Sequence, residues 1–195
     1  MAARDRSPEI LLALAALGVL AACSSDRRPA SAADRASADA LLADALGVRA
    51  AFDAGAAPAL PNLPAFALEP GCVARDADRL VFRCAVGDTR VAGTMVRTGD
   101  RLVVDLRGSG ARVFALTGDL LLRNERVDGT LALTVSAPET SVRENLTFDR
   151  IALDRSGCAV GGRLRSSVDV KGAAERSRSL EAEFGPACGE VVTLE

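Results

Sequence analysis

The sequence contains no histidine, no tryptophan and no tyrosine. Without histidine there is no Ser–His or Cys–His nucleophile, no imidazole general base and no zinc site of the usual catalytic type. A Ser-x-x-Lys pair is missing as well, because the one lysine, Lys171, follows Ser167 by four residues instead of three. We therefore predict that the chain is not an enzyme and has no catalytic residues, no cofactor and no bound metal.

Two carboxylate pairs remain as candidates for catalysis. Asp76 with Asp78, or Glu139 with Glu144, could serve a glycosidase. Sugar sites usually offer aromatic platforms, however, and both tryptophan and tyrosine are absent. Residues 76–78 also lack the further ligands and the glycine of a calcium loop. We therefore expect these acids in turns or on the surface, and a histidine-independent hydrolase is the least favoured function.

Neither sign of charge is in large excess. The 24 basic and 26 acidic residues leave a net charge of −2. Nucleic-acid-binding proteins show a basic patch or stripe, so this balance argues against a nucleic-acid partner. The apolar stretch at residues 10–20 is too short to cross a bilayer, which requires about 20 apolar residues. Because Arg4 and Arg6 precede it, this stretch is typical of an export signal.

The export signal ends in Leu20-Ala21-Ala22-Cys23, which resembles the lipobox of bacterial lipoproteins. The resemblance implies that residues 1–22 are removed and that Cys23 then carries lipid chains on its sulfur and its amino group, which makes a durable anchor. In Gram-negative lipoproteins an aspartate after the cysteine retains the protein in the inner membrane, and here Ser24 follows. The expected location is therefore the outer membrane, facing the periplasm or the cell surface. The alternative is an ordinary cleaved signal with an incidental cysteine.

Four cysteines remain after Cys23, an even number that suits an oxidising compartment. Three pairings of the four are open. Spacing favours Cys72 with Cys84 and Cys158 with Cys188, because each pair would close the mouth of a hairpin. A redox or metal site is disfavoured, since there is no Cys-x-x-Cys motif and no histidine. We therefore predict two structural disulfides.

Composition divides the mature chain into three parts. Residues 23–36 hold the lipidated cysteine and a stretch without large apolar side chains, which predicts a flexible tether. Ser37 can cap a helix over residues 37–53. The apolar residues at helical spacing are Leu41, Ala45, Val48 and Phe52. Prolines interrupt regular structure after this helix, and from residue 71 to 195 the apolar period is two. We predict one α+β domain over residues 37–195.

Apolar and polar residues alternate through that last part, as in half-buried strands. Clear examples are Leu102, Val104 and Leu106; Leu131, Leu133 and Val135; Leu146 and Phe148; and Leu180 and Ala182. Turn residues separate the segments at 98–100, 108–110, 136–139 and 155–157. No helical segment lies between them. The pattern predicts a mainly β fold with one N-terminal helix and an antiparallel sheet, arranged as a sandwich, a roll or a curved meander.

A weak repeat, Val-x-Gly-x-(Met/Leu), places Gly93, Gly129 and Gly162 at 36 and 33 residues from one another. Glycine inside a strand costs stability unless a bulge, a bend or a close backbone approach requires it. The repeat predicts one β unit used three times, and chance matching is the alternative. The pattern Cys158-x-x-Gly161-Gly162, followed by Phe184-Gly185-x-x-Cys188-Gly189, is similar to an element of poorly characterised β-rich bacterial lipoproteins and implies no activity.

Two non-catalytic functions remain for such an anchored domain. We favour a structural or interaction module of the cell envelope, in which a sheet edge or face docks another envelope protein. The alternative is a carrier of lipid or another amphiphile, in which a curved sheet and the helix enclose an apolar cavity. Six phenylalanines spread along the chain favour a packed core over a concentrated pocket.

Overall fold

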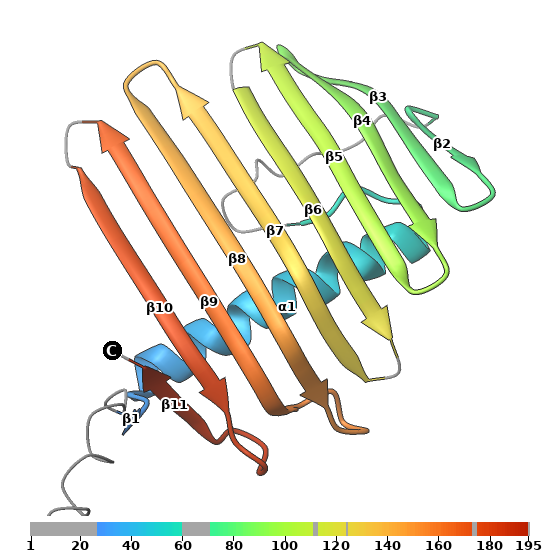
Figure 1. The fold of residues 1–195 in the computed structure, drawn as a ribbon. Helices are drawn as coiled ribbons and strands as arrows, with labels where there is room; N and C mark the ends of the chain where they lie inside the picture. Colours follow the sequence, from blue (N-terminus) through green and yellow to red (C-terminus); the bar gives the residue numbers. More distant parts are fainter. Residues whose placement is uncertain (1–26, 60–70, 111–112, 124, 173–174, 195) are drawn as a thin grey trace, which may run out of the picture.

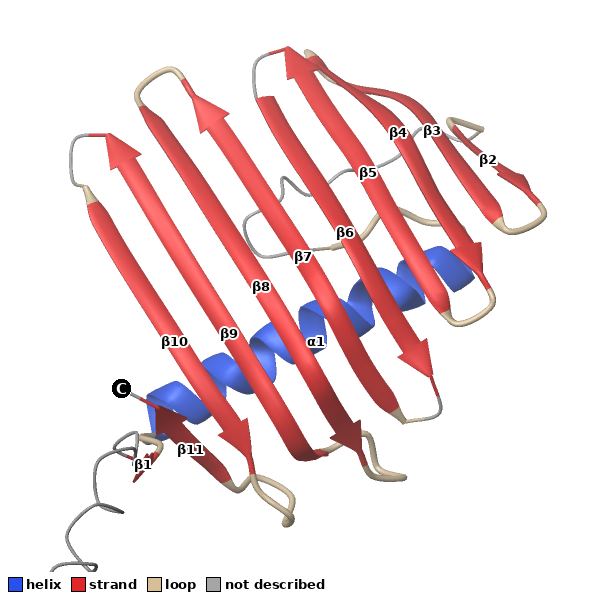
Figure 2. Ribbon diagram, in the orientation of Figure 1, coloured by secondary structure: helices blue, strands red, loops and turns tan. Residues whose placement is uncertain are grey.

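The computed structural model describes residues 27–59, 71–110, 113–123, 125–172 and 175–194. Its elements, in chain order, are β1 (Arg27–Pro29), α1 (Ala32–Ala54), β2 (Val73–Asp76), β3 (Arg79–Val86), β4 (Thr89–Thr98), β5 (Arg101–Gly110), β6 (Val113–Arg123), β7 (Arg126–Ala137), β8 (Thr140–Leu153), β9 (Ala159–Gly172), β10 (Arg176–Phe184) and β11 (Val191–Leu194). All strands belong to one 11-stranded antiparallel sheet with α1 across one face (Figures 1 and 2). This confirms the predicted mainly β class.

The sheet is a meander. Strands β2 to β10 lie side by side in chain order, and β11 and then β1 extend the sheet beyond β10. Among the described residues, β1 and β2 are therefore the two edge strands. Of the three predicted arrangements, the structure has the meander, because β2 to β10 each pair with the next strand in the chain. The connection from β1 to β2 carries α1 across one face of the sheet.

The long strands direct alternate side chains to the face that α1 covers, which we call the inner face. The predicted sets behave as expected, and most of their members are buried. The buried members are Leu102, Val104, Leu106, Leu131, Leu133, Leu146, Phe148 and Ala182. Val135 and Leu180 are half-buried. Apolar alternation in the sequence therefore identified the core face of the sheet.

Helix α1 crosses the inner face from β10 to β4 (Figure 1). Its first turn is fixed to β10 by Arg178, whose Nη2 lies 3.3 Å from Oδ1 of Asp34. Its last turn is fixed to β4 by Arg97, whose Nη1 lies 3.2 Å from Oδ1 of Asp53. The helix buries Ala38, Leu42, Ala45, Val48, Ala51 and Phe52. The apolar stripe thus packs on the core as predicted, although Leu42 takes the buried place expected for the half-buried Leu41.

The helix begins at Ala32 and not at Ser37. Ser31 is the N-cap, and its Oγ accepts a hydrogen bond of 3.1 Å from the backbone N–H of Asp34. Strand β1 pairs with β11, and the following Ala30 is buried. The predicted tether is therefore wrong over residues 27–36, while residues 23–26 lie outside the described part. The stretch lacks large apolar side chains, but alanine is the strongest helix former and its methyl group packs in close quarters.

The three glycines of the sequence repeat all have positive φ, at 143° for Gly93, 120° for Gly129 and 94° for Gly162. A Cβ atom at any of them would lie 2.0 to 2.4 Å from a carbonyl oxygen of the neighbouring strand. Close backbone approach therefore explains each glycine. The prediction of one repeated β unit is wrong, because Gly93 and Gly129 lie three strands apart in β4 and β7, whereas Gly129 and Gly162 lie two strands apart.

One predicted turn is part of a strand. Residues 108–110 belong to β5, which continues through Gly110. A Cβ atom at Gly108 would lie 2.0 Å from the ring of Phe114, and one at Gly110 would lie 1.9 Å from the carbonyl oxygen of Asp88. These two glycines are thus needed for packing across the sheet, and turn composition alone did not distinguish that role.

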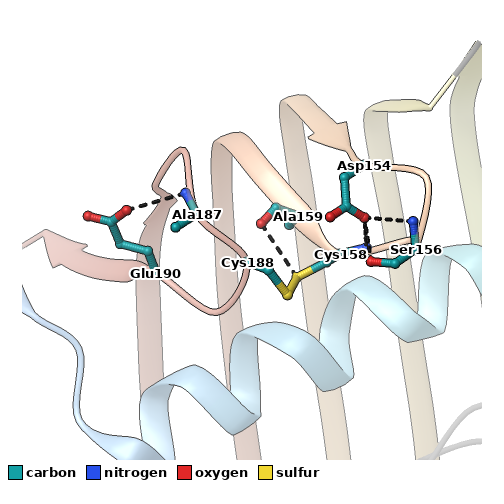
Figure 3. The surroundings of a disulfide bond; sticks show 7 residues. All are labelled: Asp154, Ser156, Cys158, Ala159, Ala187, Cys188 and Glu190. Atoms are coloured by element: carbon teal, nitrogen blue, oxygen red, sulfur yellow. Dashed lines mark hydrogen bonds between the residues drawn. A yellow bond between two sulfur atoms is a disulfide. The ribbon is translucent and has the colours of Figure 1, made fainter.

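Both predicted disulfides are present. Cys72 and Cys84 are joined with their Cα atoms 4.8 Å apart, and Cys158 and Cys188 with theirs 5.6 Å apart. The second bridge joins the start of β9 to the loop between β10 and β11 (Figure 3). Beside it, the carboxylate of Asp154 accepts hydrogen bonds from the hydroxyl group of Ser156 at 2.6 Å and from the backbone N–H groups of Cys158 at 3.0 Å and Ser156 at 2.8 Å. These bonds, the hydroxyl group's first, lower the pKa of Asp154.

Candidate functional site

The predicted lipidation residue, Cys23, lies outside the described residues. Within the described part, the single helix is not apolar enough over sufficient length to span a membrane. The described ranges also hold no group of three Cys, Asp or Glu side chains placed to bind a metal ion. The cavities of the folded domain are the remaining candidate sites.

A cleft of about 250 Å³ lies between the first half of α1 and strands β8 to β10, and we call it the helix cleft. Its helix wall consists of Ser37, Ala40, Leu41 and Asp44, which share one helix face because they are three or four residues apart. Its sheet wall consists of Glu144, Ser166, Val168, Arg178 and Leu180. Apolar atoms make up most of the lining, so this is the hollow of the domain best suited to an apolar ligand.

Each wall of the helix cleft contributes one carboxyl group, Asp44 from α1 and Glu144 from β8. Glu144 is an inner-face residue with only 9% of its surface exposed. The same two residues also border a small void of about 10 Å³, whose other lining residues are Leu131, Leu133 and Leu146. The two carboxyl groups therefore lie between the cleft and the apolar core.

Burial, together with the smaller effect of the charge of Glu144, raises the pKa of Asp44 from its ordinary value of 3.8 to about 6. The charged group on β10 that lines the cleft, Arg178, is already bonded to Asp34. Asp44 therefore holds a proton in mildly acidic solution, which lets a carboxyl group remain beside the core.

We expect the domain to lose stability as the pH rises from about 4 to about 6. In this window Asp44 is ionised in the unfolded chain but protonated in the folded one, so the free energy of unfolding falls as the pH rises. The shift corresponds to about 3 kcal/mol, and since Asp44 is only half-buried, solvent screening reduces this to roughly 1 kcal/mol. Asp44→Asn should remove the loss and be more stable than the parent at neutral pH.

Urea unfolding followed by far-ultraviolet circular dichroism, at pH values below 4 and above 6, measures this difference. Asp39→Asn, which changes an exposed carboxylate of the same helix, is the matched control and should not show the same gain. A difference between Asp44→Asn and the parent that is independent of pH would contradict the assignment.

Two further hollows lie on the described surface. One of about 330 Å³ is lined by Arg126, Asp149, Arg150, Gly162, Arg163 and Glu183. Its arginines are neutralised, since each lies 2.9 to 3.5 Å from a carboxylate of a neighbouring residue or strand. The other, of about 520 Å³, is lined mainly by Ser, Thr, Asn and charged side chains of β8 to β10. The first has a mainly polar lining. The second is larger and its lining atoms are mostly apolar, but Glu181 is its only carboxyl group, so it lacks the paired acids of the helix cleft.

The carboxylate pairs considered for catalysis are not brought together as one site. Glu139 is exposed in the turn before β8, whereas Glu144 is buried five residues further along the chain. At roughly 3.3 Å per residue this is about 17 Å along the strand, well beyond the roughly 9.5 Å that two carboxylates of a glycosidase span. Asp76 and Asp78 are exposed on either side of Ala77 in the turn between β2 and β3.

The pairing of Asp44 with Glu144 was not predicted from the sequence, although each residue carried a signal. Asp44 lies three residues after Leu41 and four before Val48, which places a carboxylate on the apolar helix face. Glu144 is in the same alternating frame as Leu146 and Phe148. An acidic residue at a position where the pattern predicts an apolar one is a candidate for a functional site. Only the fold, however, shows that these two acids face each other.

No protein family model matches this chain, and neither a curated protein nor a solved structure matches it. The helix cleft with its two carboxyl groups is therefore the observation on which a functional proposal depends.

Proposed function

We propose that this chain is a lipid-anchored extracytoplasmic protein whose helix cleft binds the apolar part of an amphiphile. The cleft itself carries the proposal. Ligand sites are mostly apolar, with a few polar groups that orient the ligand, and here Leu41, Val168 and Leu180 supply the apolar walls. A volume of about 250 Å³ is slightly below the roughly 300–1,000 Å³ of typical ligand pockets, which suits a single short chain.

The cleft also holds polar groups that could bind the head group of an amphiphile. Ser37 and Ser166 offer hydroxyl groups, and Asp44 and Glu144 offer carboxyl groups. A neutral or positively charged head group could therefore be bound through hydrogen bonds while its chain lies against the leucines and the valine. Two carboxyl groups disfavour an anionic head group, because like charges in a half-buried site repel.

The helix cleft lies beside the packed core and is not part of it. Five of the six phenylalanines, Phe52, Phe82, Phe114, Phe148 and Phe184, are buried in the continuous apolar core. The dispersed phenylalanines thus indicate a solid core, as expected, and the cleft lies beside that core under the first half of the helix.

The location follows from the lipobox resemblance and stays part of the proposal. Acylation of Cys23 would anchor the mature chain to the outer membrane, and two disulfides suit an oxidising compartment outside the cytoplasm. The membrane is then the first partner of the protein, and a lipid or another amphiphile is its ligand.

Native mass spectrometry of residues 27–195, exported with a cleavable signal and purified without detergent, tests the ligand. We expect an adduct of lipid-like mass that is lost on denaturation. Ala40→Phe should fill the helix cleft and lower the adduct fraction at least ten-fold. Ala43→Phe changes an exposed alanine of the same helix that does not line the cleft, and it should leave the adduct in place.

Equal adduct fractions in the two phenylalanine variants would show that the ligand binds elsewhere. A bare mass in the parent as well would overturn the carrier function and leave the interaction module as the proposal.

The interaction module has one observation in its favour. Strand β11 pairs with β10 only at residues 182–184, so within the described part no strand covers the outer edge of β10 over residues 176–181. A free edge can accept a strand of a partner through main-chain hydrogen bonds. The arginines at 176 and 178, however, are side chains that discourage unwanted pairing at an edge, so this function is second.

A further inference from the structure

The folded domain begins close to the predicted anchor. Only Ser24, Ser25 and Asp26 separate Cys23 from β1. An extended chain spans at most about 3.6 Å per residue, so the Cα atom of Arg27 lies within about 14 Å of that of Cys23. A connection of this length cannot hold the domain far from the membrane, in contrast to the long tether that the sequence alone indicated.

The short connection determines which end of the domain is nearest the bilayer. We call β1, β11 and the first two turns of α1 the anchor end. These elements lie together at one end of the sheet, away from β2 to β4 (Figure 1). Arg27 in β1 forms an ion pair of 3.3 Å with Glu183 of β10, which fixes β1 to the sheet. The last residue of α1 is about 33 Å from its first along the helix axis.

The helix cleft is adjacent to the anchor end. Its first helix residue, Ser37, lies five residues after the start of α1, which is about 8 Å along the axis. On its sheet side, Arg178 is bonded to Asp34 in the first turn of the helix. A bilayer at the anchor end would therefore lie beside the cleft.

The chemistry of the anchor end suits lipid head groups. Arg28 and Arg35 are exposed there beside Arg27, which is paired with Glu183, and basic residues near a membrane are attracted to anionic lipids. The large apolar side chains that are exposed in the described part, Val103, Val113 and Leu121, all lie in β5 and β6. The anchor end thus has charge for contact with head groups but no apolar side chains for insertion.

We propose that the anchor end rests on the surface of a phospholipid bilayer, so that the helix cleft exchanges its amphiphile with the lipid interface rather than with bulk water. The inference rests on the acylation of Cys23 and on the ligand proposed above. It adds an orientation: α1 points away from the membrane, its first turn near the head groups and its last turn remote from them.

The absence of tryptophan and tyrosine allows a direct test, because one introduced tryptophan is the only strong intrinsic fluorophore. The full chain is exported with its own signal, purified in detergent and reconstituted in vesicles of phosphatidylethanolamine and phosphatidylglycerol containing dansyl-labelled head groups. Ala36→Trp and Ala50→Trp change two exposed alanines of α1, about 21 Å apart along the axis. We expect energy transfer to the head groups to be at least two-fold more efficient from Ala36→Trp than from Ala50→Trp.

An insert of about 10 Gly and Ser residues between Asp26 and Arg27, which adds a span of roughly 17 Å, should make the two efficiencies similar. Co-flotation with the vesicles tests the anchor separately, and Cys23→Ser should abolish it. Co-flotation of the parent with equal transfer from both tryptophan positions would overturn the orientation alone. Failure of the parent to float would overturn the anchor and the orientation together.

Discussion

Gly129→Ala should remove a large part of the stability of the domain, at least about 4 kcal/mol of the roughly 5–15 kcal/mol that a domain has in total. Two causes add. Gly129 has a φ of 120°, which side-chain-bearing residues rarely adopt, and an added Cβ would lie 2.0 Å from the carbonyl oxygen of Asp119. The backbone of β6 would have to move, and the ladder between β6 and β7 would break at the centre of the sheet.

Substitutions at two other glycines distinguish the effect of the positive φ from that of the close contact. Gly157 has a φ of 84° and nothing within 4 Å of an added Cβ, so Gly157→Ala should lose only the roughly 1–3 kcal/mol of backbone strain. Gly47 lies in α1 with open space around it, so Gly47→Ala should gain about 0.5–1 kcal/mol. Urea midpoints measured by circular dichroism rank the three variants. A loss for Gly129→Ala no larger than that for Gly157→Ala would refute the close approach between β6 and β7.

The features that the sequence predicted are those that local patterns encode. An apolar period of two identified the inner-face residues of β5, β7 and β8, since strand side chains alternate whatever the strand order. Cysteine spacing identified both disulfides, because each pair encloses a segment that folds back on itself. For the three in-strand glycines the sequence left a bulge, a bend or a close backbone approach open, and the structure shows a close backbone approach at each, without a repeated unit.

The features that were missed depend on contacts between distant segments. Residues 27–29 have no strand pattern of their own and become β1 because the C-terminal β11 pairs with them. The strand order of the meander could not be predicted, because the sequence does not show which connections are tight turns. The helix cleft requires the register of α1 on β8, which brings Asp44 and Glu144 together across 100 residues of chain. No periodicity within either segment contains that register.

Replacing Cys158 and Cys188 together by alanine should destabilise the domain by about 4 kcal/mol, and replacing Cys72 and Cys84 by about 3 kcal/mol. In the chain-entropy model a disulfide restricts the unfolded chain more when it closes a longer loop, and the two bridges span 30 and 12 residues. Neighbouring contacts should widen the difference between the two losses of stability. The ends of the shorter loop are also held by the backbone hydrogen bond of 2.9 Å from the N–H of Arg83 to the carbonyl of Cys72.

The end of the sheet that follows Cys188 has little support beyond this disulfide. Strand β11 pairs with β10 over only three residues and with β1 over three more, so without the bridge to Cys158 this end of the sheet depends on few hydrogen bonds. We expect the amides of β11 to lose protection from hydrogen exchange in the Cys158/Cys188 variant, while those of β5 to β8 keep theirs until global unfolding. Equal loss of protection in all strands would contradict this.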